Sequence, residues 1–137
     1  PPFRGNEDRL AIIEGLKDGT IDAIVSNHNP QDFDSKFSEF DLASFGMSGL
    51  QTFLPALVIL SNEIGWELLI QKITEGPASI LGHTLDAWTI FDPNEEWIYD
   101  EKSNRSLSSN HPWFGQKLKG MVKYMIKGGQ LVTVYEA

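Results

Sequence analysis

The sequence lacks cysteine, any cluster of basic residues and any long apolar run. Without cysteine the chain cannot form a disulfide framework, a thiolate zinc site or a cysteine nucleophile. Eleven Lys and Arg against nineteen Asp and Glu give a net charge of −8, which argues against a nucleic-acid or anionic-membrane surface. The longest apolar run, Phe53 to Leu60, is far shorter than the ~20 residues that cross a bilayer. We therefore expect no nucleic-acid partner, no membrane partner and a cytoplasmic location.

What is present suffices for one folded unit. The 137 residues are 41% hydrophobic and 11% aromatic, which is too apolar for a disordered chain. A chain of this length buries roughly two-thirds of its unfolded surface on folding. The composition therefore indicates an acidic globular domain.

The first part of the chain has the pattern of an α/β protein. Asn6 is a good N-cap and Gly19 a good C-cap for a first helix. The β-branched run Ile21–Val25 is typical of a strand buried on both faces of a parallel sheet. A helix followed by a short loop and such a strand is half of a βαβ unit. Further helices are expected at residues 50–60, 66–73 and 78–81.

The second part has the pattern of an antiparallel β module. Strands are expected at residues 87–91, 96–99, 121–126 and 130–135. Gly128 and Gly129 between the last two runs predict a hairpin. Trp88, Trp97 and Trp113 are most simply the core of this layer, and an aromatic interface is the alternative. We place a domain boundary near residue 83, which gives units 1–82 and 83–137.

Candidate functional residues follow the expected strand. Residues 26–31 are polar and lie where sites gather in α/β folds, at the carboxyl end of a strand. The three histidines, His28, His83 and His111, form no metal-binding pair, and His28 has the pattern of a loop histidine. Gly46 and Gly49 fit either a close approach to a ligand or a turn before the next helix. These patterns alone predict no mechanism.

A series of short segments, in one order along nearly the whole chain, resembles a known family. The segments are Pro1-Pro2-Phe3-Arg4, Glu7-Asp8-Arg9, residues 14–24, Phe45-Gly46, Gly49-Leu50, Leu54-Pro55, Pro77-Ala78, Ile80-Leu81-Gly82, Phe91-Asp92-Pro93, Trp97, Leu118-Lys119-Gly120 and Gly128-Gly129. They resemble the C-terminal portion of dihydroorotases, cyclic amidohydrolases of pyrimidine biosynthesis. The resemblance implies the last segment of a metal-dependent (β/α)8 TIM barrel plus a small antiparallel β domain, with Ile21–Val25 as the eighth barrel strand.

The resemblance also implies a chemistry. Dihydroorotases reversibly close carbamoyl aspartate to dihydroorotate with one or two zinc ions. Most of their metal ligands lie upstream of this region, so we expect this chain alone to bind no zinc. One barrel strand cannot close a barrel, so we expect the chain alone to be inactive. We expect it to be a truncation product that associates with copies of itself or with a missing N-terminal half.

The family pattern Asp-His-Ala-Pro-His reads Asn27-His28-Asn29-Pro30-Gln31 in this sequence. In the family the Asp binds metal and acts as the general base and acid, and the last His helps to hold the substrate carboxylate. Asn27 takes the catalytic and metal-binding position, but an amide accepts no proton near neutral pH and is a poorer ligand. Gln31 can still donate a hydrogen bond to a substrate but carries no charge. Gly46 and Arg4 match the family and are further substrate-binding candidates.

A second departure lies between Gly82 and Asp86, where the family has a longer stretch with a strand. Either the module has lost a strand or a segment is absent from the chain.

Two functions from different classes follow from the resemblance. The first is part of a dihydroorotase whose site is impaired at Asn27 and Gln31. The alternative is a non-catalytic homologue that supports aspartate transcarbamoylase assembly, which Asn27 favours. A third interpretation, action on a hydantoin-like ring, stays open but ranks lower because of the match at Leu118-Lys119-Gly120.

Overall fold

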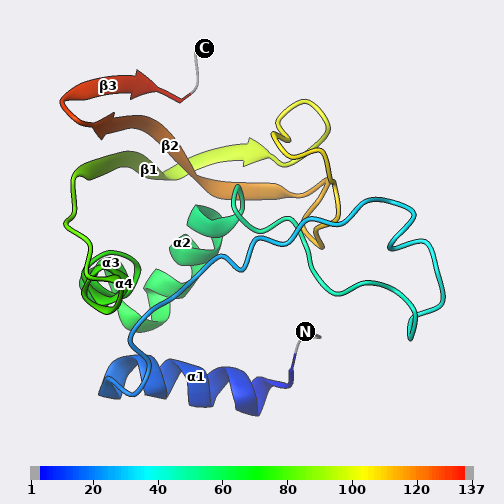
Figure 1. The fold of residues 1–137 in the computed structure, drawn as a ribbon, viewed down its shortest axis with the longest axis horizontal. Helices are drawn as coiled ribbons and strands as arrows, with labels where there is room; N and C mark the ends of the chain where they lie inside the picture. Colours follow the sequence, from blue (N-terminus) through cyan, green and yellow to red (C-terminus); the bar gives the residue numbers. More distant parts are fainter. Residues whose placement is uncertain (1–3, 135–137) are drawn as a thin grey trace.

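The computed structural model describes residues 4–134 and places four helices before one small sheet (Figure 1). The helices are α1 (Asn6–Asp18), α2 (Phe53–Ile64), α3 (Trp66–Ile73) and α4 (Glu75–Leu81). The strands are β1 (Ala87–Ile98), β2 (Lys117–Lys127) and β3 (Gln130–Thr133). The matching segment Pro1-Pro2-Phe3 and the end of the predicted last strand, Tyr135, lie outside the described residues. None of the described helices has the length and apolarity needed to cross a bilayer.

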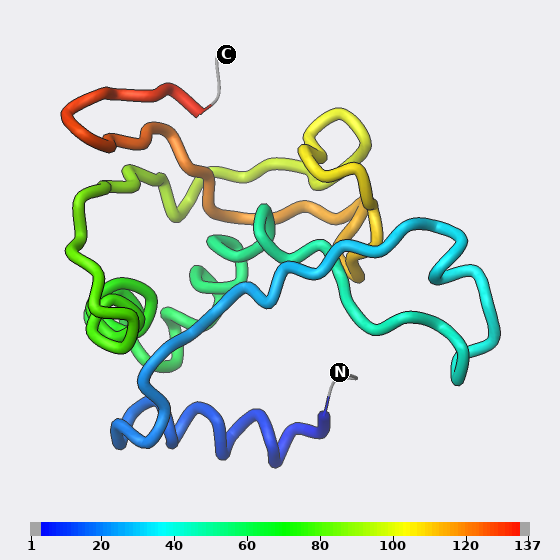
Figure 2. The backbone as a smooth tube through the Cα atoms, in the orientation of Figure 1, coloured from blue at the N-terminus to red at the C-terminus, as the bar shows by residue number. Residues whose placement is uncertain are grey.

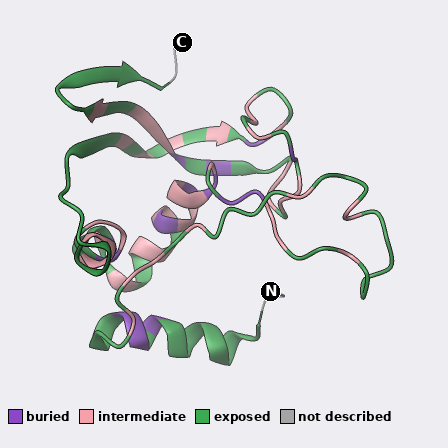
Figure 3. Cartoon of the chain, viewed as in Figure 1, coloured by how far each residue is buried: buried purple, intermediate pink, exposed green. Residues whose placement is uncertain are grey.

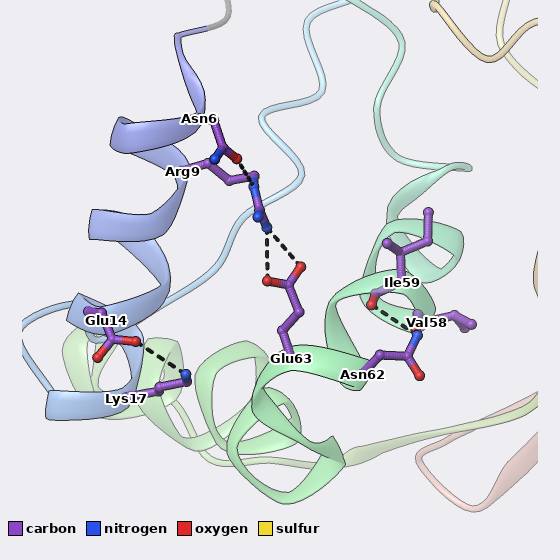
Figure 4. A network of polar contacts seen from close by, with 8 residues as sticks. All are labelled: Asn6, Arg9, Glu14, Lys17, Val58, Ile59, Asn62 and Glu63. Carbon is purple, nitrogen blue, oxygen red and sulfur yellow. Dashed lines mark hydrogen bonds and ion pairs between the residues drawn. The ribbon is translucent and has the colours of Figure 1, made fainter.

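The first helix forms as predicted but starts from a different cap. Gly5, not Asn6, is the N-cap, and its N–H donates to Asp8 Oδ2 at 3.1 Å. Gly19 ends the helix in the left-handed conformation, with φ of 86°. Arg9 pairs with both carboxylate oxygens of Glu63 on α2 (Figure 4). Both side chains are largely exposed, so this pair contributes about 1 kcal/mol or less to stability.

The prediction of a strand at Ile21–Val25 is wrong for this structure. The segment runs between α1 and the loops without pairing in a sheet. Its backbone groups bond elsewhere: the Ile21 N–H donates to Gly15 O at 2.8 Å, and the Ile24 N–H to Lys72 O at 2.9 Å. A parallel strand needs neighbours from distant parts of a chain, and residues 4–134 provide none beside this segment. Its sequence pattern therefore lacks the partners that would make it a strand.

The sheet is antiparallel, in the order β1-β2-β3. The predicted hairpin is confirmed: Lys127 pairs with Gln130 across Gly128 and Gly129, whose φ angles are 56° and 76°. The two strands predicted at residues 87–91 and 96–99 are instead one strand, β1, with a register shift between Asp92 and Glu96. Pro93 falls in this irregularity, where its missing N–H costs no ladder bond.

The buried apolar residues are few and come from α1 and α3 as well as from the contact between α2 and the sheet, and much of the sheet is exposed (Figure 3). Tyr99 and Leu69 are fully buried. Gly120 lets α2 approach β2, since a Cβ there would lie 2.8 Å from Val58 Cγ2. The prediction that Trp88 is in the core is wrong, because it is 72% exposed on an uncovered part of β1. Trp97 and Trp113 are half-buried.

Candidate functional site

Two loop segments that are distant in sequence lie side by side. Between Gly19 and Thr52 the chain forms no helix or strand and follows an irregular path (Figure 2). Within it, the Asn29 N–H donates to Met47 O at 3.0 Å. The Asn29 side chain Nδ2 donates to Phe45 O at 3.1 Å. Residues 26–31 and 45–50 therefore form one hydrogen-bonded unit, which we call the loop pair.

Gly46 and Gly49 permit this pairing. A Cβ on Gly46 would lie 2.4 Å from Asn29 O, and Gly46 has φ of 129°. A Cβ on Gly49 would lie 2.6 Å from Ser26 O. The sequence left open whether these glycines serve a ligand or a turn. The structure adds a third reason, because both positions allow close backbone contact within the loop pair.

His28 joins the two segments through its ring. Its Nδ1 accepts the N–H groups of Gly49 and Leu50, both at 3.1 Å. A nitrogen that accepts two N–H groups carries no proton, so the neutral ring is protonated on Nε2. His28 is thus a loop histidine that anchors the chain just before α2, as its sequence context indicates.

Two of the three residues that depart from the family pattern contact each other. Gln31 Nε2 donates to Asn29 Oδ1 at 3.1 Å. Asn27 is exposed and adopts φ of 45°, in the left-handed region that Asn tolerates better than most residues. Two of the three amides in this loop therefore form a hydrogen-bonded network, and the third lies beside them in sequence.

A third segment, residues 104–111, supports the loop pair from the sheet side. Asn110 Nδ2 donates to Gly46 O at 2.8 Å, and the Ser48 N–H donates to Asn110 O at 3.0 Å. Ser48 Oγ lies 3.0 Å from Ser106 Oγ. Ser48 is 3% exposed, so these bonds are largely shielded from water.

His111 links this third segment to the start of α2. Its Nδ1 accepts the Trp113 N–H at 3.0 Å, so its Nε2 carries the proton and donates to Thr52 Oγ1 at 3.0 Å. The ring also packs edge-on against Tyr99. Burial lowers the pKa of His111 below its usual value, because the charged ring would lose hydration without gaining a partner. The neutral ring is therefore the form that fits this site.

A pocket of about 540 Å³ lies between the loop pair and the sheet. Its polar lining residues include His28, Ser48 and Ser106. Its apolar lining residues include Leu50, Leu54, Trp97, Met121, Val122 and Met125. This lining is mostly apolar but includes the cationic side chain of Arg105, and it contains no pair of carboxylates that could share acid and base roles.

The described residues do not make a metal site by themselves. Within residues 4–134 no group of three or more His, Cys, Asp or Glu side chains could hold a metal ion. At position 27 the chain offers a neutral amide oxygen, which is a weak zinc ligand. The donor set of residues 4–134 therefore does not fit zinc without ligands from elsewhere.

The structure brings together most, but not all, of the candidate residues. Asn27 and Gln31 share one loop, and Gly46 lies against that loop at Asn29. Arg4 precedes α1 and is exposed, and no hydrogen bond found in residues 4–134 joins it to the loop pair. Asn29 and Asn110 were not predicted from the sequence as structural residues of the site. For Asn29 a signal was present, since an amide replaces the alanine of the family pattern.

Comparison with known proteins finds similar curated proteins but no family model. No family model matches the chain. The dihydroorotase of Aquifex aeolicus is 44% identical over 143 aligned residues, which cover 96% of this chain and 33% of that protein. The resemblance to dihydroorotases is thereby confirmed, and the chain spans about a third of the length of the curated relatives it matches.

Solved structures share the fold of the described region. An L-hydantoinase (dihydropyrimidinase) from Arthrobacter aurescens superposes with a TM-score of 0.81 at 25% identity, over 97% of this chain and 33% of that one. The inactive dihydroorotase-like domain of a multifunctional protein from Chaetomium thermophilum superposes with a TM-score of 0.66 at 17% identity, over 94% of this chain and 36% of that domain's chain. At that lower identity the likeness shows the fold alone.

Proposed function

We propose that this chain is the C-terminal part of a dihydroorotase-like cyclic amidohydrolase whose site is impaired at Asn27 and Gln31. The observation that carries the proposal is the 44% identity to a dihydroorotase over 96% of the chain. In this proposal residues 1–82 complete the metal-dependent barrel, where strands from outside this chain give residues 21–25 the neighbours that the described residues lack, and residues 83–137 form the small β domain. The substrate class is dihydroorotate and carbamoyl aspartate.

The impairment follows from the chemistry of the amide groups. A general base must accept a proton from the attacking water, and the Asn27 amide does not do so near neutral pH. Gln31 Nε2 already donates to Asn29 Oδ1 and brings no positive charge toward a substrate carboxylate. Gly46 and Arg4 are the proposed remaining substrate contacts. Zinc, which this family uses, would have to be held by residues outside this chain.

The test compares dihydroorotate hydrolysis by the complete zinc-loaded protein and by its Asn27→Asp, Gln31→His variant. We expect little turnover by the wild type and a gain on the order of a hundredfold or more in the double variant, the usual contribution of general acid–base catalysis. The matched control carries Asn62→Asp and Gln71→His, the same two exchanges at exposed helical positions. Turnover by the wild type at an ordinary enzymic rate would contradict the impairment.

A second candidate is a non-catalytic role that supports aspartate transcarbamoylase assembly. The observation that favours it is Asn27 itself, and a dihydroorotase-like domain described as inactive is among the structures that share the fold. For this candidate both the wild type and the double variant stay inactive, while the complete protein co-sediments with aspartate transcarbamoylase. Absence of co-sedimentation would exclude it.

A further inference from the structure

The Asn29 side chain makes two hydrogen bonds within the loop pair. Its Nδ2 donates to Phe45 O at 3.1 Å, and its Oδ1 accepts from Gln31 Nε2 at 3.1 Å. One side chain thus uses its donor on residues 45–50 and its acceptor on position 31. No other side chain in residues 26–31 connects both.

We propose that Asn29 is a positioning residue. Its side-chain amide holds the side chain at position 31 within the loop pair and away from a bound substrate. The proposal rests on the proposed function and deepens it, because it concerns how position 31 meets the substrate carboxylate. Asn29 Oδ1 takes one of the two N–H donors of the Gln31 amide and fixes the direction of that amide, so the amide cannot offer both donors to a carboxylate. The amide at position 29 is therefore as much part of the impairment as the amide at position 31.

Most of the hydrogen bonds that join the loop pair do not involve the Asn29 side chain. The Asn29 N–H donates to Met47 O through backbone atoms, which Asn29→Ala leaves in place. His28 Nδ1 still accepts the Gly49 and Leu50 N–H groups. Asn29 O remains 2.4 Å from the position of a Gly46 Cβ, so the close approach is set by backbone atoms. Asn29→Ala should therefore release position 31 while the loop pair stays folded.

The consequence for activity is specific. In the Asn27→Asp, Gln31→His background we expect the imidazole at position 31 to donate to Asn29 Oδ1 as the Gln31 amide does, so that an added Asn29→Ala frees it for the substrate carboxylate. We expect the KM for dihydroorotate to fall about tenfold, the equivalent of one charge-assisted hydrogen bond gained, while kcat changes less than about twofold. Asn94→Ala, at an exposed position of β1, is the matched control and should leave KM unchanged.

A second measurement decides the proposal without activity. In the complete wild-type protein labelled with 15N-glutamine, the side-chain signal of Gln31 should move to the position of a free amide on Asn29→Ala. Asn29→Asp keeps an acceptor oxygen and should leave the Gln31 signal near its wild-type position. Either an unmoved Gln31 signal in Asn29→Ala or an unchanged KM in the triple variant overturns the positioning role.

The two measurements separate this proposal from the proposed function. If the Gln31 signal moves but no variant hydrolyses dihydroorotate, the positioning role stands and the dihydroorotase proposal fails. If the double variant is active and the Gln31 signal does not move, the reverse holds.

Discussion

The segment Ile21–Val25 and the hairpin of β2 and β3 have apolar strand-like sequences, yet only the hairpin forms a sheet. The partner of β2 begins three residues after β2 ends, so two glycines bring it into register. The segment Ile21–Val25 has the pattern of a parallel strand, whose neighbours come from distant parts of a chain. The comparison shows that antiparallel pairing is complete within this chain, whereas parallel pairing is not.

The loop pair also lacks a neighbouring strand among the described residues, because it follows Ile21–Val25 directly. No strand neighbour fixes residues 26–31; side-chain and backbone bonds to residues 45–50 do so instead. Lys72, which is 7% exposed, holds the segment Ile21–Val25 that precedes the loop pair. Its backbone O accepts the Ile24 N–H, and its ammonium group donates to Ile21 O. The site region is therefore stabilised by individual bonds, and the sheet region by cooperative pairing and burial.

The largest expected effect is in the sheet region. Tyr99→Ala removes a fully buried ring that packs against Trp97, His111 and Phe114. Loss of a buried aromatic side chain costs about 3–5 kcal/mol of the free energy of unfolding. Urea unfolding of Tyr99→Ala and of Tyr124→Ala, whose ring is 41% exposed, measures the difference. Equal losses in the two variants would mean that burial does not hold the sheet.

A smaller loss is expected where the loop pair closes. Gly46→Ala places a methyl group against Asn29 O, at a backbone φ that alanine rarely adopts, and should cost about 2–3 kcal/mol. Gly128→Ala is the control in the hairpin, because its Cβ would meet nothing within 4 Å. Its cost is limited to backbone strain of about 1–2 kcal/mol. If the control lost as much stability as Gly46→Ala, steric closure of the loop pair would not be important.

The ammonium group of Lys72 is expected to stabilise the segment Ile21–Val25. Lys72→Met should lower the free energy of unfolding by about 1–3 kcal/mol, because the partly buried Ile21 O then lacks a donor. The side chain keeps its length and its apolar stem, so the change isolates the ammonium group. Amide hydrogen exchange should accelerate at Ile24, which bonds to the backbone of the same residue. Lys17→Met, at an exposed end of α1, is the control. Unchanged exchange at Ile24 would show that the ammonium does not stabilise this segment.

The sequence predicted local elements well because local interactions determine them. The cap at Gly19, the bounds of α3 and the Gly128-Gly129 hairpin all follow from residues within a few positions of one another. The error at Ile21–Val25 has the opposite origin, because a pattern that fits a parallel strand does not supply its neighbours. Trp88 was misplaced for a related reason: β propensity says which residues suit a sheet but not which face is covered.

The candidate site was predicted only in outline. The polar loop after residue 25 and the glycines at positions 46 and 49 stood out as patterns. Their mutual contact did not, because Asn29 and Gly46 are far apart in sequence and meet only through tertiary structure. The support from Asn110 has no local sequence signal at all.

The smallest expected effect is the pH dependence of stability that His111 contributes. This ring bonds to Thr52 near the loop pair and packs against Tyr99 in the core, so it links the two regions. Burial lowers the pKa of His111 in the folded protein, so the unfolded chain binds this proton first as the pH falls. The contribution of the neutral ring is fully present above about pH 6.5, the ordinary histidine value, and is lost as the pH drops through the lowered folded pKa.

Urea unfolding at about pH 7.5 and about pH 5.5, a window above the titration of ordinary carboxylates, should show lower stability at the acidic value. His111→Gln should flatten this dependence, whereas His83→Gln, at an exposed position, should retain it. An identical pH dependence in wild type and His111→Gln would mean that His111 does not couple the sheet to the loop pair by its protonation.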